Sequence, residues 1–150
     1  LKRSGSGLFH VTDNVEMIAQ AAVGNIEPRP ELRPESSTGG SILADACRWY
    51  ALDVEQLDDS KERTRIECNV VARGRLRDFF GFNRAKHAVL EAAILATRIK
   101  FLPAERIQVE IERLAVLVEK TAGQAEQRAF RFLRQYIDNS NPIHEEPAVK

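Results

Sequence analysis

Residues 83–98 read NRAKHAVLEAAILATR, and this stretch decides how the second half of the chain folds. Between Ala88 and Ala96 the only polar residue is Glu91. A helix that is apolar on nearly every side is a buried helix. Asn83 suits the N-cap position, where a side-chain oxygen accepts a hydrogen bond from the first turn. We therefore predict a buried helix that starts after Asn83 and ends near Lys100.

A line of polar side chains runs along this predicted helix. At about 100° per residue, its members fall within an arc of roughly 60°. They are Arg84, His87, Glu91 and Arg98. We interpret Glu91 and Arg98 as members of an ion-pair network, because charges on a buried helix need partners.

The N-terminal end of the same helix is a candidate phosphate site. Free backbone N–H groups and the helix dipole favour an anion there. The candidate residues are Asn83, Arg84, Lys86 and His87. Purely structural roles for these residues remain an alternative. A general acid–base role for His87 is another, although no partner can be assigned to it.

Two more helices follow, one beginning at Pro103 and ending near Thr121, the other spanning about Gln124 to Asp138. The predicted core stripes are Ile107, Ile111, Leu114 and Val118 in the first, and Ala125, Ala129, Phe132, Leu133 and Tyr136 in the second. Short connections make consecutive helices antiparallel. Residues 83–139 are therefore predicted to form a three-helix bundle, and residues 140–150 a flexible tail.

Strand patterns dominate the first half of the chain. We predict a strand over residues 8–11 and a helix over residues 14–23, with Thr12 or Asp13 as its N-cap and Gly24 after its end. Residues 47–57 and 64–72 are predicted to form an antiparallel hairpin with one buried face. In its second strand, Thr64, Ile66, Cys68, Val70 and Ala72 are expected to share that face.

Between residues 26 and 41 no regular element is predicted, because Pro28, Pro30 and Pro34 interrupt any pattern. A loop of this length is either mobile or covers a site, and we favour mobility. The predicted strands need more sheet than the chain supplies, since an isolated hairpin is marginal in water. The chain also begins at Leu1, so we expect further strands upstream of it.

Composition excludes several classes of function. The 22 basic and 22 acidic residues cancel, which argues against general attraction to nucleic acid or anionic lipid. No apolar run reaches the roughly 18 residues that a membrane span needs. Two cysteines make no disulfide framework, so a cytoplasmic setting is expected. His10, His87 and His144 show no metal-ligand spacing, and we predict no metal site.

Three further sets of residues have a common structural explanation. Cys47 and Cys68 are predicted to be small core residues. One of the neighbouring aromatic residues 49 and 50 is expected in the core, with stacking on a flat ligand as the alternative. Arg73, Arg75 and Arg77 form a basic cluster; solvated charges are the commoner explanation, and phosphate contact is the alternative.

Three segments resemble an uncharacterised prokaryotic family, domain of unknown function 447. They are residues 9–14 (FHVTDN), 81–98 (GFNRAKHAVLEAAILATR) and 118–123 (VEKTAG), and the resemblance covers essentially the whole chain. The middle segment is the specific one, and the family often has glycine where this chain has Ala122. That family resembles flavin reductases, with an FMN-binding split β-barrel, usually dimeric, followed by a helical domain.

The resemblance implies an α+β fold in which residues 1–82 are the later part of an FMN-binding split barrel. A threonine and an asparagine that resemble reductase flavin contacts would lie just before Leu1. It also implies that the segment from His10 to Asp13 runs near the flavin, and His10 and Thr12 are carried over as cofactor-binding residues. The implied function is an FMN-dependent oxidoreductase of unknown substrate that forms a homodimer.

Two other functions stay open. The first is a non-enzymatic module that binds FMN or a related cofactor for storage or sensing. The second is a nucleic-acid role for the arginines between Arg73 and Arg84, against which the zero net charge counts.

Overall fold

A computed structural model describes residues 1–140 of the 150-residue chain. Its elements are helices and antiparallel strands, so the predicted α+β class is confirmed. The chain divides into two compact units. The strand unit comprises residues 1–13 and 29–79. The helical unit comprises residues 14–28 and, in the described part of the chain, the residues that follow 79.

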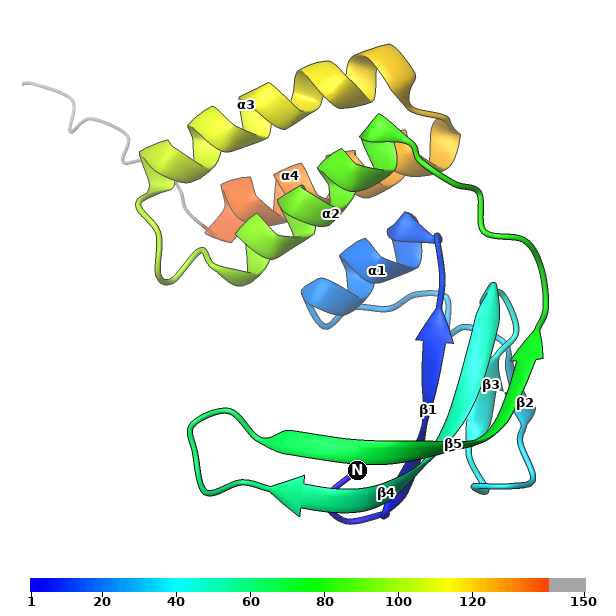
Figure 1. The fold of residues 1–150 in the computed structure, drawn as a ribbon. Helices are drawn as coiled ribbons and strands as arrows, with labels where there is room; N and C mark the ends of the chain where they lie inside the picture. Colours follow the sequence, from blue (N-terminus) through cyan, green and yellow to red (C-terminus); the bar gives the residue numbers. More distant parts are fainter. Residues whose placement is uncertain (141–150) are drawn as a thin grey trace, which may run out of the picture. The chain divides into compact units, whose positions relative to one another are not determined.

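The strand unit contains two antiparallel sheets (Figure 1). Strands β1 (Ser6–Val11), β4 (Arg48–Asp58) and β5 (Arg65–Arg75) form a three-stranded sheet in the order β1-β4-β5. Strands β2 (Leu32–Pro34) and β3 (Ser41–Leu43) form a two-stranded sheet. The predicted strand near residue 8 and the predicted hairpin are both present. Over residues 1–140 these strands form open sheets and not a closed barrel.

The β2–β3 hairpin overturns the prediction that residues 26–41 contain no regular element. Its turn is organised by Glu35, which is buried. The Glu35 carboxylate accepts hydrogen bonds from the backbone N–H and the hydroxyl of Ser37 and from the same two groups of Thr38, at 2.7–2.9 Å. These bonds, with the Ser37 backbone N–H first, lower the pKa of Glu35 to about 2. Proline cannot donate a hydrogen bond to a strand ladder, and β2, which ends at Pro34, is only three residues long. The hydrogen bonds of Glu35 stabilise the turn of this short hairpin.

Two register shifts interrupt the β4–β5 ladder, between Ala51 and Leu52 and between Val54 and Gln56. A bulge changes which side chains share a face, because the side-chain period along a strand is two. Val70 was predicted on the buried face together with Ile66 and Cys68. It is instead 54 % exposed, so this part of the prediction was wrong.

The backbone of β5 passes close to Trp49 at Gly74. Trp49 and Gly74 are directly opposite each other in the β4–β5 register. A Cβ atom at residue 74 would lie 2.4 Å from the indole Nε1 of Trp49 and 2.6 Å from its Cε2. Only glycine therefore leaves room for the indole ring at this position.

Replacement of Gly74 by alanine is expected to displace the Trp49 ring. Overpacking of this kind costs about 1–2 kcal/mol. Trp49 is the one tryptophan of the chain, so its fluorescence reports on this site directly. We expect Gly74→Ala to shift the emission maximum and to lower the melting temperature. An unchanged spectrum and melting temperature would contradict the close packing. Ala72→Gly is the control, because it removes packing from the same strand without adding an atom. Gly39→Ala would be unsuitable, because the φ of Gly39 is positive.

Within residues 1–140 the helical unit contains four helices, not the three that were predicted (Figure 1). They are α1 (Val15–Ala22), α2 (Arg84–Thr97), α3 (Ala104–Thr121) and α4 (Gln124–Ser140). The additional member is α1, which contributes Val15 and Ala19 to the core of the bundle. Glu16 of α1 also accepts two hydrogen bonds from Arg128 of α4, at 2.8 and 2.9 Å. The sequence predicted α1 but not where it packs.

The core of the bundle lies between close-packed helices. Helix α2 buries small residues at Ala85, Ala88, Ala92, Ala93 and Ala96, which allows neighbouring helices to approach it closely. The larger fully buried side chains come mainly from α3 and α4: Ile107, Ile111, Leu133 and Ile137. The predicted core stripe of α3 is confirmed, with Leu114 partly buried. In α4 the predicted Ala129 and Leu133 are buried, and Phe130 joins them.

The N-cap of α1 is not Thr12 or Asp13, as predicted, but the next residue along the chain. Asn14 is the N-cap, and its side-chain oxygen accepts a hydrogen bond from Met17 N at 3.0 Å. Asp13 was a candidate for this role but is bound elsewhere, as described below. Gly24 follows the helix with a φ of 75°, as predicted for the residue after a C-cap.

The polar line on α2 faces solvent. Arg84, His87, Glu91 and Arg98 are all exposed, and Ile94 on the same side is 41 % exposed. Neither Glu91 nor Arg98 forms an ion pair with any described residue, so the predicted network was wrong. The physical reason is that α2 is covered on only part of its circumference.

No helix within residues 1–140 has the length and apolar content required to cross a membrane. The flexible tail was predicted for residues 140–150. Ser140 is the last residue of α4, and the rest of that segment lies outside the described residues.

Candidate functional site

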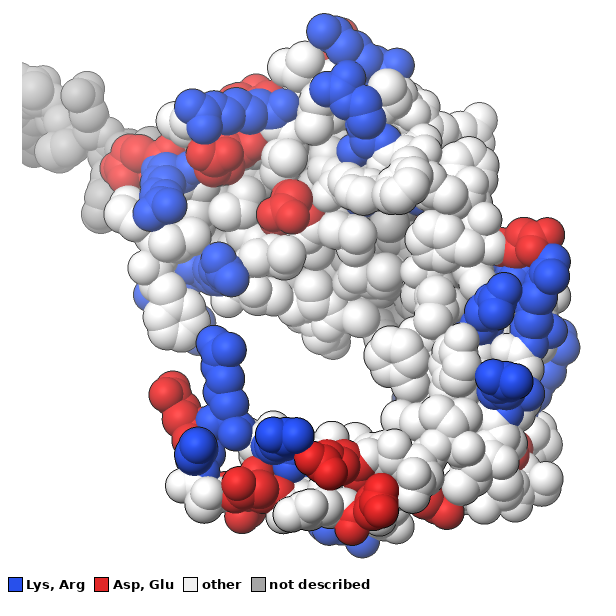
Figure 2. Space-filling model, viewed as in Figure 1, with Lys and Arg blue, Asp and Glu red and all other residues white. Residues whose placement is uncertain are grey.

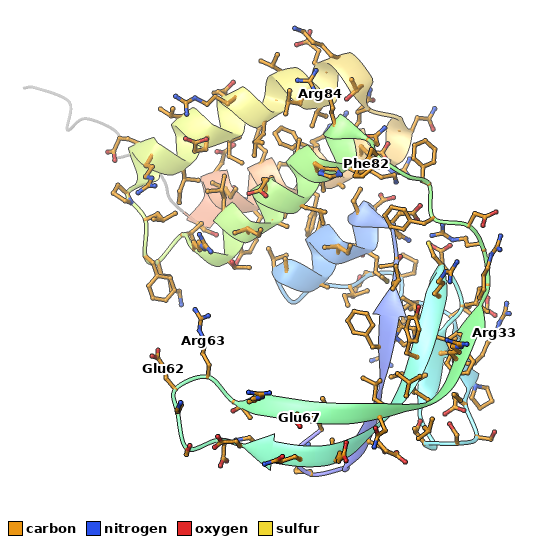
Figure 3. The ribbon with its side chains drawn as sticks, in the orientation of Figure 1. Arg33, Glu62, Arg63, Glu67, Phe82 and Arg84 are labelled. Carbon is orange, nitrogen blue, oxygen red and sulfur yellow. The ribbon has the colours of Figure 1, made fainter. Side chains whose placement is uncertain are left out.

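The start of α2 combines a cap, basic side chains and exposed aromatic residues. Asn83 is the N-cap, as predicted, and its side-chain oxygen accepts a hydrogen bond from Lys86 N at 2.9 Å. The first turn contains no acidic residue. The backbone N–H groups of Arg84 and Ala85 have no intrahelical acceptor, because they precede the first full turn. Figure 3 shows Arg84 and Phe82 at this end of α2.

Lys86 is held by a buried acid of α4. Its Nζ lies 2.9 Å from Oε1 of Glu126, and the two side chains are only 17 % and 9 % exposed. The ammonium group also lies over the ring of Phe80, 5.4 Å from its centroid. Such a cation–π contact adds to the attraction of the pair. Lys86 therefore joins α2 to α4 as well as carrying charge at the end of α2.

Glu126 has two partners. Its Oε2 accepts a hydrogen bond from Gly123 N at 2.9 Å, which caps the start of α4. Burial acts to raise the pKa of Glu126, but hydrogen bonds from Lys86 and from backbone N–H groups outweigh it and lower that pKa. Glu126 is therefore a buried carboxylate in its ionised form at neutral pH.

His87 is exposed and lies beside Phe82. The ring centroids are 6.3 Å apart with an interplanar angle of 42°. Phe82 is 99 % exposed. An exposed aromatic residue next to a histidine and a basic helix end supplies flat apolar surface that a planar ligand can contact.

His10 and Thr12 belong to the strand unit. His10 lies in β1, and its Nε2 accepts a hydrogen bond from Leu43 N of β3 at 3.1 Å. A nitrogen that accepts from a backbone N–H carries no proton, so the ring is neutral in this arrangement. Burial lowers the pKa of His10, which agrees with the neutral form. Thr12 directly follows β1 and is half-buried. The structure thus gives His10 a role in joining two sheets.

A buried acid at the end of β1 was not identified from the sequence as a site. Asp13 Oδ1 lies 2.6 Å from Nη2 of Arg77, and the Asp13 side chain is 6 % exposed. Arg77 also donates from Nη2 to the carbonyl oxygen of Asp45 at 2.9 Å. The Cys47 thiol lies 3.6 Å from Asp13 Oδ1, and burial raises the pKa of that thiol. These four residues tie three segments of the strand unit together.

This arrangement separates Arg77 from the basic cluster predicted with Arg73 and Arg75. Arg77 is bound to acids, and its pKa is raised mainly by the hydrogen bond to Asp13. On the sheet, the basic residue next to Arg75 is Arg48 of β4, which is directly opposite Arg75 in the register.

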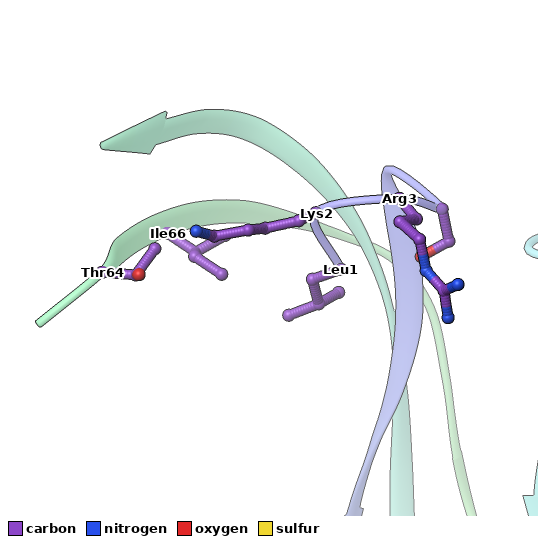
Figure 4. A pocket seen from close by; sticks show the side chains of 6 residues that line it. Leu1, Lys2, Arg3, Thr64 and Ile66 are labelled. Carbon is purple, nitrogen blue, oxygen red and sulfur yellow. The ribbon is translucent and has the colours of Figure 1, made fainter. Parts of the chain in front are cut away.

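An open hollow of about 860 Å³ lies in the strand unit (Figure 4). It is lined by Leu1, Lys2, Arg3, Ser4, Thr64 and Ile66. Lys2 is exposed and its Nζ pairs with Asp59 at 2.9 Å. Among the described residues, the one ion pair of its lining is already made within the chain, and we assign the hollow no ligand. Within residues 1–140, no three His, Cys, Asp or Glu side chains gather as a metal site would require.

Comparison with known families identifies both halves of the chain. The family model described as protein of unknown function (DUF447), N-terminal domain, matches residues 1–77. The model described as protein of unknown function (DUF447) matches residues 83–135.

The chain belongs to the DUF447 family.

The resemblance drawn from residues 9–14, 81–98 and 118–123 is thereby confirmed. A solved structure of the DUF447 family has a similar fold. It is an FMN-bound protein from Methanosarcina mazei, 18 % identical to this chain, with a TM-score of 0.75. The match covers 90 % of this DUF447 chain and 73 % of the other. A comparison with curated proteins gave no match.

Proposed function

We propose that this DUF447 protein binds FMN and acts as a flavin-reductase-like oxidoreductase. The observation that carries the proposal is the fold shared over 90 % of the chain with an FMN-bound protein of the same family. FMN, when bound, supplies hydride and electron transfer, and the protein supplies position and electrostatics.

The residues at the start of α2 fit the phosphate of FMN. This end of the helix offers the N–H groups of Arg84 and Ala85, the exposed Arg84 side chain and no competing acid in the first turn. Asn83 holds the turn in place, and His87 borders it. Lys86 adds positive charge, although it shares that charge with Glu126. In the strand unit, His10 and Thr12 are proposed to border the flavin.

Three further features belong to the same proposal. The strand unit is proposed to be part of a split β-barrel, and the protein to be a homodimer. A cytoplasmic location is proposed because Cys47 and Cys68 are both free thiols, as is usual in a reducing compartment.

The phosphate assignment is tested by comparing FMN with riboflavin, which lacks the phosphate. We expect Arg84→Ala to weaken FMN binding about tenfold, the size of one charge-assisted interaction, and to leave riboflavin binding unchanged. Arg106→Ala on α3 is a matched control that removes the same charge elsewhere on the helical unit. Equal loss of FMN and riboflavin, or no loss of either, would contradict the assignment.

The alternative function is a non-enzymatic module that stores or senses flavin. Its distinguishing measurement is turnover. We expect the FMN-loaded protein to oxidise NADH or NADPH in the presence of an electron acceptor, and free FMN at the same concentration sets the background rate. Tight FMN binding with a rate no higher than this background would favour the alternative.

A further inference from the structure

One face of the β4–β5 sheet brings three arginines together. Arg48 is directly opposite Arg75, and Tyr50 is directly opposite Arg73. Residues that are opposite each other in an antiparallel pair point to the same face, as do residues two apart along one strand. Arg48, Tyr50, Arg73 and Arg75 therefore share one face. Figure 2 shows basic side chains gathered on the side of the strand unit where β5 ends and β2 lies, and Arg33 of β2, labelled in Figure 3, is in the same region.

The arginines are poorly neutralised within the chain. Arg75 pairs with Asp78, and both side chains are more than half exposed. Neither Arg48 nor Arg73 forms an ion pair with any residue among 1–140. Other arginines of the strand unit do have acidic partners: Arg33 with Glu31, Arg65 with Glu67, and Arg77 with Asp13 and Asp45. Since the chain as a whole has no net charge, this excess of positive charge is local.

Like charges directly opposite each other in a sheet are destabilising. The Arg48–Arg75 pair is therefore unfavourable. Asp78 offsets part of the charge of Arg75 from an exposed position, and an anion bound between the two arginines would relieve the repulsion further. A hollow of about 160 Å³ occurs at this place, lined by Arg48, Tyr50, Arg73, Gly74 and Arg75. Guanidinium groups bind phosphate with paired hydrogen bonds, and the Tyr50 hydroxyl adds another donor.

Aromatic surface adjoins the arginines on the same face. Phe9 of β1 is directly opposite Tyr50, and their ring centroids are 6.4 Å apart. Phe9 is 56 % exposed. Exposed aromatic rings on a sheet, next to arginines, can stack on the planar ring of a ligand while the arginines hold its phosphate.

We propose that Arg48, Arg73, Arg75 and Tyr50 form a binding site for a phosphate ester, and that Phe9 and Tyr50 contact a planar ring of the same ligand. Two sources share this chemistry. One is FMN itself, in which case the inference rests on the proposed FMN binding and the sheet replaces α2 as the phosphate site, so that Arg84→Ala would leave FMN binding unchanged. The other is a separate phosphorylated ligand with a planar ring, such as a nucleotide co-substrate. We call Arg48, Tyr50, Arg73 and Arg75 the arginine face.

The experiment uses the full chain and two charge-matched double variants. Arg48→Gln/Arg73→Gln removes the two unpaired charges of the arginine face. Arg63→Gln/Arg65→Gln removes the same charge from the far end of the hairpin, where Figure 3 shows Arg63. Both variants change exposed residues. Each is titrated with inorganic pyrophosphate, FMN and riboflavin by calorimetry, and melting temperatures are measured with and without pyrophosphate.

We expect wild type and Arg63→Gln/Arg65→Gln to bind pyrophosphate equally, and Arg48→Gln/Arg73→Gln to bind it at least about tenfold more weakly. Without ligand, Arg48→Gln/Arg73→Gln is expected to melt no lower than wild type, because the repulsion has been removed. If it also loses FMN affinity but keeps riboflavin affinity, FMN is the occupant. If its FMN affinity is unchanged, the occupant is a separate phosphate ester.

The proposal is overturned if Arg48→Gln/Arg73→Gln retains wild-type affinity for pyrophosphate. It is equally overturned if wild type itself does not bind pyrophosphate. A parallel titration uses single-stranded RNA. The proposal is also overturned if wild type binds this RNA through the arginine face but does not bind pyrophosphate. Failure of wild type to bind FMN, with pyrophosphate binding lost only in Arg48→Gln/Arg73→Gln, would remove the proposed function and leave the phosphate site standing.

Discussion

Replacement of Lys86 by methionine is expected to destabilise the helical unit by about 3 kcal/mol. Methionine keeps the length and apolar stem of lysine but leaves Glu126 buried without its counter-charge. Removing one partner of a buried ion pair costs about 3–5 kcal/mol, and we take the lower value because Lys86 is 17 % exposed. Loss of helical circular dichroism in urea gives the free energy of unfolding.

The effect of Lys86→Met should depend on pH. In wild type the pKa of Glu126 is lowered, so its contribution to stability is present above the unfolded-state pKa of about 4.3 and is lost as pH falls through the folded-state value. In Lys86→Met the lowering effect of Lys86 on that pKa is lost, whereas burial still raises the pKa and the backbone N–H bonds still lower it. The variant should therefore differ most from wild type near neutral pH and least where the carboxyl is protonated in both.

Two comparison variants make this prediction specific. In Lys86→Met/Glu126→Gln both charges are absent and glutamine can still cap α4, so most of the lost stability should return. Arg113→Met removes an exposed partner of Glu110 on α3 and should change stability by less than about 0.5 kcal/mol. A pH-independent loss in Lys86→Met, with no recovery in the double variant, would mean that packing and not charge explains it.

Replacement of Arg77 by methionine is expected to destabilise the strand unit by about 2–3 kcal/mol. Asp13 would remain buried without a counter-charge, and the bonds from Arg77 to Asp45 would be lost. Trp49 lies in the same unit and is the one tryptophan, so its fluorescence follows this transition separately from the helices.

The Arg77 result has its own control on the same strand unit. Arg65 pairs with Glu67 on the exposed hairpin, and Arg65→Met should have little effect on stability. Arg77→Lys should recover only part of the loss, because a lysine cannot bind Asp13 and Asp45 with a fixed fork of donors. Equal stability of the Arg77→Met and Arg65→Met variants would show that the buried pair is unimportant.

Elements with local signals could be predicted from the sequence. Asn83 marks the start of α2, and the apolar repeats of α3 include Ile107 and Ile111, which the structure buries. These signals lie within a few residues of the feature that they predict. The partner of a helix does not have such a signal, which is why the packing of α1 against α4 through Glu16 and Arg128 was missed.

The same distinction applies to the candidate sites. Asp13 and Arg77 are far apart in sequence, and no pattern links them before the fold is known. Arg48 joined Arg73 and Arg75 only once the register of β4 and β5 was available. The ion-pair network predicted for Glu91 and Arg98 is absent among the described residues. Helical spacing places these two residues on one side of α2, but spacing alone does not determine which side of the helix other elements cover.

Titration of the full chain with FMN tests the central claim, that this DUF447 protein binds the flavin. The protein is purified, stripped of bound flavin and titrated while flavin fluorescence and melting temperature are recorded. We predict saturable binding and a melting temperature that rises with FMN, since a ligand at 100 times its Kd stabilises the native state by about 2.7 kcal/mol. Unchanged flavin fluorescence, with the same melting temperature at every FMN concentration, would contradict the account.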